Sequence, residues 1–376
     1  MTMKKIAKNI KFEEALAELE QQVQLLESGE LPLEEALAAF QQGVALSKVC
    51  MTKLNTVQQE VEKSSLLLTT ITNMNWKHSQ SWRIDMDFNK YYEDRQKLVN
   101  TFLEKRLEKK GISRVDEAMA YSLLAGGKRI RPIILMATAD ALGVSGYNFL
   151  PVACGLEMIH TYSLIHDDLP CMDDDEYRRG RLTNHKVFGE ALALLAGDAL
   201  LTLAFEVMLE QKNVPAEALI ETVREVAMCA GNFGMVGGQV IDLDSEGRQI
   251  SEEELRKLHA GKTGALFIAA VRSGARLSGA ASDELLALTK FADLLGLAFQ
   301  ITDDILDVEG DAAQMGKAAH SDEKKHKSTY VTLYTLEGAK ALAQKTVDEA
   351  LGCLEMFGEN AEALREITKM MCGRKN

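Results

Sequence analysis

The sequence predicts an all-α protein in two parts, an N-terminal helical hairpin followed by a bundle of about ten helices. Three observations point to this fold class. Apolar residues recur every three or four positions along most of the chain, and no strand-like alternation is sustained. A hydrophobic content of 46% with only 5 prolines favours ordered helices. The length of 376 residues suits two or three domains with a large buried core.

The first part, residues 1–64, contains the hairpin. Its first helix is expected to begin at Phe12 and to carry an apolar stripe as far as Gly29, a residue that suits a helix end. Pro32 and the acids after it open a second helix, whose apolar residues keep near-heptad spacing to Val61. A single hairpin buries too little surface to be stable alone, so we expect its apolar stripe to face a partner chain.

The second part begins after a change in composition. Residues 65–85 are rich in Ser, Thr and Asn, lack helical periodicity and hold both tryptophans, which predicts a linker. Helical patterning then fills residues 86–376. Loops are expected at Gly126-Gly127, Gly143 to Gly146, Arg179-Gly180, Asp244 to Arg248 and Gly310 to Lys327.

The charge balance narrows the function classes. There are 43 basic and 56 acidic residues, a net charge of −13, so no global field draws the chain to nucleic acid or to an anionic membrane. We therefore expect no direct nucleic-acid binding, and a polyanionic ligand has to be held locally.

The sequence also indicates a compartment. The 6 cysteines are scattered without a CxxC pair, which favours free thiols in a reducing environment. No apolar run reaches the roughly 18 residues of a membrane helix, because the longest candidate, Ala191 to Phe205, is interrupted by Gly197 and Asp198. The N-terminus lacks the apolar segment of a secretory signal. We expect a cytoplasmic protein that is not embedded in a membrane.

Two aspartate clusters, each at the end of an apolar helix, are the candidate metal sites. Their members are Asp167, Asp168, Asp173, Asp303, Asp304 and Asp307. Asp303 and Asp307 are four residues apart, on one helix face. Pro170 disfavours helical geometry at the preceding residue, so the chain should leave the helix there and present Asp173 again. Carboxylates without His or Cys partners suit Mg²⁺, whereas either cluster alone could be a solvated acidic loop.

Basic residues complement the aspartates. Lys128 and Arg131 follow the Gly126-Gly127 turn, and Arg178 and Arg179 follow the first aspartate cluster. Arg offers two parallel donors to phosphate oxygens, Lys offers a point charge, and glycine allows close backbone approach. Taken singly, each pair is typical of an exposed surface. Their alternation with the carboxylates favours phosphate recognition.

Through these aspartate and basic motifs, residues 86–376 resemble the trans-prenyltransferases, in particular the bacterial short-chain branch of farnesyl diphosphate synthases. In family order and spacing, the motifs are GGKRIRP, HTYSLIHDDLPCMDDD, RRG, GGQVIDLD, GKTGAL and FQITDDILDV. The resemblance implies an isoprenoid-synthase-type bundle around a deep apolar central cavity, working as a homodimer.

The reaction that the resemblance implies is a head-to-tail condensation. An allylic diphosphate, dimethylallyl or geranyl, ionises, the double bond of isopentenyl diphosphate attacks the cation, and a proton is lost to give farnesyl diphosphate. The implied cofactor is Mg²⁺, three ions in the family, with Mn²⁺ able to substitute. The metal ligands would be Asp167, Asp173 and Asp303, with Asp168, Asp304 and Asp307 beside or behind them.

Matching motif positions assigns the remaining roles. Isopentenyl diphosphate would be bound by Lys128, Arg131, His160 and Arg179. The allylic diphosphate would be held by Arg178, Lys262 and Lys317. Expected to act at the reacting carbons are Lys262, Thr263 and Gln300. Gln239 and Asp242 would lie close to the metal, and His166 would be either a core residue or a neighbour of the metal ligands.

Tyr162 is the expected chain-length residue. It lies five residues before Asp167, a little over one turn along the same helix, where a bulky ring can block growth beyond C15. The alternative is an ordinary core tyrosine.

Two features depart from the family pattern. Tyr330 is followed by Val331 where family members commonly carry KxTYPxL, and we expect only an adjusted helix start there. The C-terminal segment is less typical than the basic tail that often closes the active site, so Arg374 and Lys375 have no assigned role.

Residues 12–64 resemble a different family, the small subunit of bacterial exodeoxyribonuclease VII, through FEEALAELEQQVQLLESGELPLEEALAAFQQGVALSK. Such subunits are helical hairpins that pack on a large catalytic subunit. The resemblance implies binding to that large subunit and no nuclease chemistry of its own. Two origins stay open: a physiological fusion, or two neighbouring coding regions joined by a frameshift or a lost stop, with the synthase starting at Met86.

Four alternatives to a farnesyl diphosphate synthase remain: a geranylgeranyl diphosphate synthase, a class I terpene cyclase, an inactive regulatory prenyltransferase subunit, and a non-catalytic module that docks through the hairpin. A cyclase typically pairs one Asp-rich motif with an Asn/Ser/Glu-type motif and does not need GGKRIRP. Two intact aspartate motifs disfavour the inactive subunit.

Overall fold

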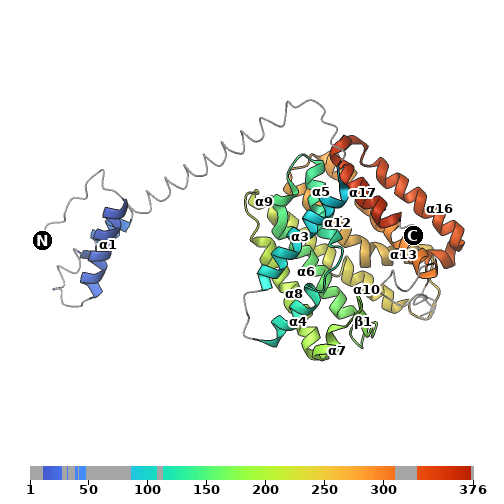
Figure 1. Cartoon of the computed structure of the whole chain (residues 1–376), viewed down its shortest axis with the longest axis horizontal. Helices are drawn as coiled ribbons and strands as arrows, with labels where there is room; N and C mark the ends of the chain where they lie inside the picture. The colour runs from blue at the N-terminus through green and yellow to red at the C-terminus, as the bar shows by residue number, and fades with distance from the viewer. Residues whose placement is uncertain are drawn as a thin grey trace. The chain divides into compact units, whose positions relative to one another are not determined.

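The computed structural model describes residues 12–27, 32, 39–40, 42–47, 86–107, 113–309 and 328–373. The chain divides into two compact units, Met1–Asp85 and Met86–Asn376 (Figure 1). The predicted linker, residues 65–85, lies outside the described residues.

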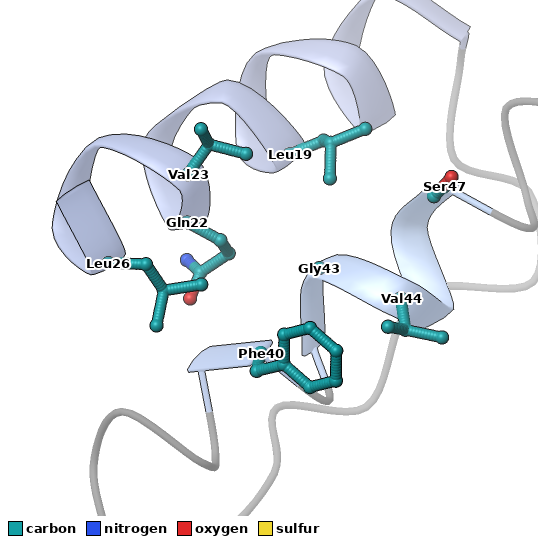
Figure 2. Close-up of a pocket in the computed structure, with 8 residues that line it drawn as sticks. All are labelled: Leu19, Gln22, Val23, Leu26, Phe40, Gly43, Val44 and Ser47. Atoms are coloured by element: carbon teal, nitrogen blue, oxygen red, sulfur yellow. The ribbon is translucent and has the colours of Figure 1, made fainter. Parts of the chain in front are cut away.

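The N-terminal unit contains the first predicted helix, α1 (Phe12–Glu27). Residues 39–40 and 42–47 are also helical, as expected for the second helix, and the rest of that helix lies outside the described residues. Apolar side chains of the two segments face each other across a groove (Figure 2). Within the described residues, the two segments therefore pair as predicted for a helical hairpin.

The second unit is helical almost throughout. Its elements are α3 (Phe88–Leu107), α4 (Arg114–Leu123), α5 (Ile130–Ala141), η1 (Gly146–Phe149), α6 (Leu150–Asp167), β1 (Tyr177–Arg178), β2 (Arg181–Leu182), α7 (Asn184–Phe188), α8 (Glu190–Leu209), α9 (Ala216–Ala230), α10 (Met235–Asp244), α11 (Glu252–His259), η2 (Ala260–Gly264), α12 (Ala265–Leu277), α13 (Ser282–Glu309), α16 (Tyr330–Gly352), η3 (Glu355–Ala361) and α17 (Glu362–Cys372). The all-α prediction is confirmed. Within the described residues, the departure from it is a two-residue antiparallel ribbon, in which Tyr177 faces Leu182 around the predicted turn at Arg179-Gly180.

The core sits where helices are apolar on every side. In α5, every residue from Pro132 to Ala139 is buried, as expected for an interior helix. α12 packs against α5, α9 and α13, and α6 packs against α8. A second apolar cluster gathers residues of α11, α13 and α16 around Tyr330. The expected loops at residues 126–127, 143–146, 179–180 and 244–248 fall between helices, and the fifth, Gly310 to Lys327, lies outside the described residues.

The expectation that no segment is long and apolar enough to span a membrane is wrong for two helices. α8 and α13 are long and apolar enough by length and composition, with mean hydropathies of 1.9 and 1.4 over 18 residues. The prediction depended on an uninterrupted apolar run, whereas a mean hydropathy over 18 residues tolerates residues such as Gly197 and Asp198. Both helices pack within the bundle, α8 on α6 and α13 on α16, as core helices do.

Candidate active site

One face of α6 opens toward solvent inside an otherwise buried helix. Residues Val152 to Ile159 are all buried, but His160, Leu164 and Asp167 are partly exposed. With Ser163, they follow the i, i+3, i+4, i+7 spacing of a single helix face. The core leaves this face partly uncovered, and the face ends at the first aspartate cluster.

The first aspartate cluster folds back on itself as predicted. α6 ends at Asp167, and the Asp173 backbone N–H donates to the Asp167 carbonyl at 2.9 Å. Pro170 lies between them, where the chain leaves the helix. The loop therefore returns Asp173 to the end of α6.

Asp168 is held in an ion pair with Arg178. Its carboxylate accepts from Arg178 Nε at 2.7 and 2.9 Å, and Arg178 also approaches Asp175 at 3.5 Å. Asp168 is only 3% exposed. The structure thus joins a predicted metal-site residue to a predicted diphosphate ligand.

The second aspartate cluster lies at the C-terminal end of α13, with Asp303 exposed and the other two aspartates buried. Asp304 accepts from the Tyr330 backbone N–H at 2.7 Å and from the Gln300 amide nitrogen at 3.4 Å. Asp304 therefore fixes the start of α16 against α13.

The donor chemistry of the two clusters fits Mg²⁺, because all six side chains supply hard carboxylate oxygens. Among the described residues, however, no three His, Cys, Asp or Glu side chains come together in a preformed metal site. Magnesium usually combines one or two protein carboxylates with water and substrate phosphates. A magnesium ion in this protein would need ligand oxygens to complete its coordination.

A hydrogen-bonded chain joins three of the predicted site residues. Thr263 donates to Gln300 Oε1 at 3.1 Å, and the Gln300 nitrogen continues to Asp304. These bonds set the orientation of the Gln300 amide.

Lys262 forms an ion pair with Asp242 at 2.5 Å. The Gln239 Nε2 atom on α10 is buried without a hydrogen-bond partner in the described structure, so a donor remains to be satisfied there.

Glycine packing brings α10 against the segment that carries Lys262 and Thr263. This segment, η2, is a π-helical turn, a feature that often occurs at functional sites. A Cβ atom on Gly238 would collide with the Lys262 backbone nitrogen, and the Gly238 Cα lies 3.0 Å from the Cβ position of Gly261. The sequence carries no signal for this contact, although the two glycines belong to the GGQVIDLD and GKTGAL motifs.

The basic turn is held by side chains from other elements. Gly126 and Gly127 have φ values of 83° and 133°, which favour glycine. Three successive carbonyls, those of Gly126, Gly127 and Lys128, accept from Arg179, from Gln96 at 2.9 Å and from Tyr92. The turn is therefore fixed on three sides.

Several arginines act electrostatically on His160. Burial lowers the pKa of His160 well below 6.5, and Arg131, Arg179, Arg178 and Arg129 lower it further. Burial also lowers the pKa of Arg131 to about 10, with Arg179 acting in the same direction. Each depressed pKa reflects the cost of crowding cations in a poorly solvated place, a cost that a bound polyanion would relieve.

The remaining predicted residues are placed as follows. Tyr162 is buried in α6, and its ring meets His166 edge-on at 5.6 Å. His166 Nε2 lies 3.0 Å from the Leu194 carbonyl of α8, so His166 is a packing residue between α6 and α8. Lys317, Arg374 and Lys375 lie outside the described residues.

Comparisons with known proteins agree on two separate segments. Residues 112–371 match the family model described as polyprenyl synthetase, and residues 12–63 match that of the exonuclease VII small subunit. The farnesyl diphosphate synthase of Geobacillus stearothermophilus is 44% identical over 287 residues, covering 76% of this chain and 97% of that protein. The geranylgeranyl diphosphate synthase of Cyanophora paradoxa is also 44% identical, over 76% of this chain and 96% of its own length.

A solved structure shows the same architecture. An FPP/GFPP synthase from Zymomonas mobilis superposes with a TM-score of 0.69 at 35% identity, covering 77% of this chain and all of the other, 100%.

Proposed function

The chain belongs to the polyprenyl synthetase family and is a prenyltransferase, and we propose that its second unit condenses isopentenyl diphosphate head to tail with dimethylallyl or geranyl diphosphate to give farnesyl diphosphate. The observation that carries the proposal is the open face of α6, on which His160, acted on by Arg131, Arg178 and Arg179, is followed two turns later by Asp167 of the first aspartate cluster. A site that is cationic on one side and rich in carboxylates on the other suits two diphosphates, one of them bound through metal.

Three aspartates are the proposed metal ligands. Asp167, Asp173 and Asp303 would hold Mg²⁺ together with diphosphate oxygens, and Mn²⁺ could take its place. When bound, the metal neutralises the charge that develops on the departing diphosphate. Asp168 and Asp304 have other tasks in the structure, since they hold Arg178 and the start of α16. Asp307 lies on α13 with Asp303 and Asp304 and is buried.

The chain's own residues bind and orient the substrates. Isopentenyl diphosphate is assigned to Lys128, Arg131, His160 and Arg179, and the allylic diphosphate to Arg178, Lys262 and Lys317. Thr263 and Gln300 are joined by a hydrogen bond, and their oxygen dipoles can stabilise an allylic cation. Water has to be excluded from the site during the reaction, because it would otherwise trap the cation.

Product length is proposed to depend on Tyr162. Overall identity does not separate C15 from C20, because relatives named for each product are both 44% identical. The buried Tyr162 ring lies on α6 below Asp167, where a growing chain would meet it. This position favours farnesyl diphosphate over geranylgeranyl diphosphate.

We infer a homodimer from apolar side chains left on the surface of the second unit. Leu194 and Leu195 on α8 are 46% and 54% exposed, and Ile220 and Met228 on α9 are 60% and 52% exposed. A partner chain usually covers exposed apolar side chains where they gather into a patch. Light scattering of the purified protein would give the mass of two chains, and a monomer would contradict the inference.

We propose that residues 12–64 bind an exonuclease VII large subunit. Leu19, Val23, Leu26, Phe40 and Val44 line an apolar groove of about 480 Å³ between the two helical segments (Figure 2). Val23 and Phe40 are 43% and 59% exposed, although both are apolar. Co-purification with the large subunit should succeed for the full chain and fail for Phe40→Glu. Equal recovery of both would contradict the proposal.

We place the protein in the cytoplasm. The described cysteines, Cys154, Cys171, Cys229, Cys353 and Cys372, are all free thiols, which suits a reducing compartment.

Product analysis tests the central proposal. Purified full-length protein is incubated with isopentenyl diphosphate and either dimethylallyl or geranyl diphosphate, with and without Mg²⁺. Farnesyl diphosphate that forms only with the metal is the expected result. A folded protein that makes no condensation product with Mg²⁺ present would contradict the proposal and favour a binding role.

A further inference from the structure

We propose that the buried ion pair between Arg129 and Glu157 is a positioning device, which sets the register of Lys128 and Arg131 on the basic turn against His160 on α6 and so controls the binding of isopentenyl diphosphate. The proposal rests on the proposed function, and it adds two residues that contact neither substrate. Arg129 is the interior member of the GGKRIRP motif, with a side chain that points away from the site and into the protein.

The Arg129 guanidinium joins three other helices to the turn. It donates to Asn100 Oδ1 of α3 at 2.8 Å, to the Leu123 carbonyl at the end of α4 at 2.7 Å, and to Glu157 Oε1 of α6 at 2.8 Å. The side chains of Arg129 and Glu157 are 1% and 2% exposed. A charge buried this deeply holds its geometry closely, because every alternative leaves an unpaired ion in the interior.

The backbone of Arg129 shows that its position is imposed by these contacts. It has φ 52° and ψ 36° at the N-cap of α5, a left-handed conformation that L-residues other than Asn and Asp rarely adopt. Lys128 precedes it and Arg131 follows two residues later, while Glu157 lies three residues, less than one turn, before His160. The pair therefore connects the basic turn, which carries Lys128 and Arg131, to the part of α6 that carries His160.

The test compares two ion pairs in the same enzyme. The double variant Arg129→Met/Glu157→Met removes both charges, which buried pairs often tolerate, and Glu157→Gln keeps an acceptor if the double variant folds poorly. The control is Arg95→Met/Asp140→Asn, because Arg95 and Asp140 form a 2.6 Å pair between α3 and the far end of α5. That control pair lies nine residues, about 13 Å, along the helix from Arg131.

The readout is steady-state kinetics with each substrate varied in turn. We expect KM for isopentenyl diphosphate to rise by about tenfold or more, with kcat and KM for geranyl diphosphate changed by less than about threefold. The control variant should lose stability without a change in either KM.

Three outcomes would count against the positioning role. It is overturned if KM for isopentenyl diphosphate stays unchanged, if both KM values rise together, or if Glu157→Gln behaves like the control. A wild-type enzyme that forms no product contradicts the proposed function instead, so the two failures are distinguishable.

Discussion

The charge state of His160 is set by its neighbours. Burial and Arg131, Arg179, Arg178 and Arg129 lower its pKa, so the imidazole is neutral in the folded protein near pH 7. A neutral imidazole can donate one hydrogen bond to a diphosphate oxygen without adding to an already crowded set of cations.

This shift predicts a pH dependence of stability. The unfolded chain, with a histidine pKa of about 6.5, takes up a proton more readily than the folded protein, so stability is lost as pH falls below about 6.5 toward the lower folded pKa. Replacing His160 with Gln should reduce this loss by up to about 1.4 kcal/mol per pH unit. Urea unfolding between about pH 7 and pH 5 would show it. Parallel curves for variant and wild type would contradict the assigned shift.

Tyr162 predicts a change in product. Tyr162→Ala opens space on α6 below Asp167, so products longer than C15 should appear, with a loss of about 3 kcal/mol in stability from the cavity. Chromatography of the products after phosphatase treatment checks this. Phe149→Ala is a matched control, because Phe149 is also buried but lies 13 residues earlier, at the end of η1 and before the start of α6. A Tyr162→Ala enzyme that still stops at C15 would leave Tyr162 as a core residue.

At the same scale, some site residues could be predicted from the sequence and others could not. The return of Asp173 to Asp167 followed from a local property, the geometry forced by Pro170. The Arg129–Glu157 pair joins residues 28 positions apart, and nothing in their spacing reports that both are buried. Residue pairs that only tertiary packing brings together can be identified only from the structure.

At the scale of the elements, the close approach of two helical segments determines where the functional side chains lie. α10 and η2 meet through glycines, which lets Asp242 reach Lys262. Helical patterning covers both motifs, GGQVIDLD and GKTGAL. It does not show that the two motifs touch, because a contact between backbones leaves no apolar periodicity in the sequence.

Gly238→Ala tests this contact. The new methyl group would collide with backbone atoms that cannot rotate away, so α10 must shift from η2. We expect a loss of about 1–3 kcal/mol in stability and of at least about 100-fold in kcat/KM. Gly352→Ala is the matched control, since nothing lies within 4 Å of its Cβ position in α16. Chemical denaturation and steady-state kinetics check both variants, and equal activity would show that the separation of α10 and η2 is unimportant.

At the scale of the whole molecule, the two units carry separate family signatures. The polyprenyl synthetase match begins at residue 112 and the exonuclease VII small subunit match ends at residue 63. Both the fold class and the two-part organisation could be predicted from the sequence, because helical periodicity and motif order are local signals. That α8 and α13 pack inside the bundle could not be predicted, since burial depends on the whole unit and not on the hydropathy of one helix.

Removal of residues 1–85 should leave catalysis intact. The second unit forms its own compact body and holds every described candidate site residue, so kcat/KM should stay within about twofold of the full chain. Product assays on the shortened protein check this. A large loss of activity in a folded protein would assign the first unit a part in catalysis. Intact-mass analysis of native material addresses the fusion itself, since a mass starting at Met86 would exclude it as the physiological protein.

The arginine cluster lies in a molecule with a net charge of −13, and this contrast has a consequence for encounter rates. A diphosphate approaching from afar meets a repulsive field, and it is attracted only within about 8 Å, the screening length at physiological salt. Added salt weakens the distant repulsion more than the attraction inside the partly buried site. Salt should therefore speed the capture of isopentenyl diphosphate at low ionic strength, the reverse of ordinary electrostatic steering.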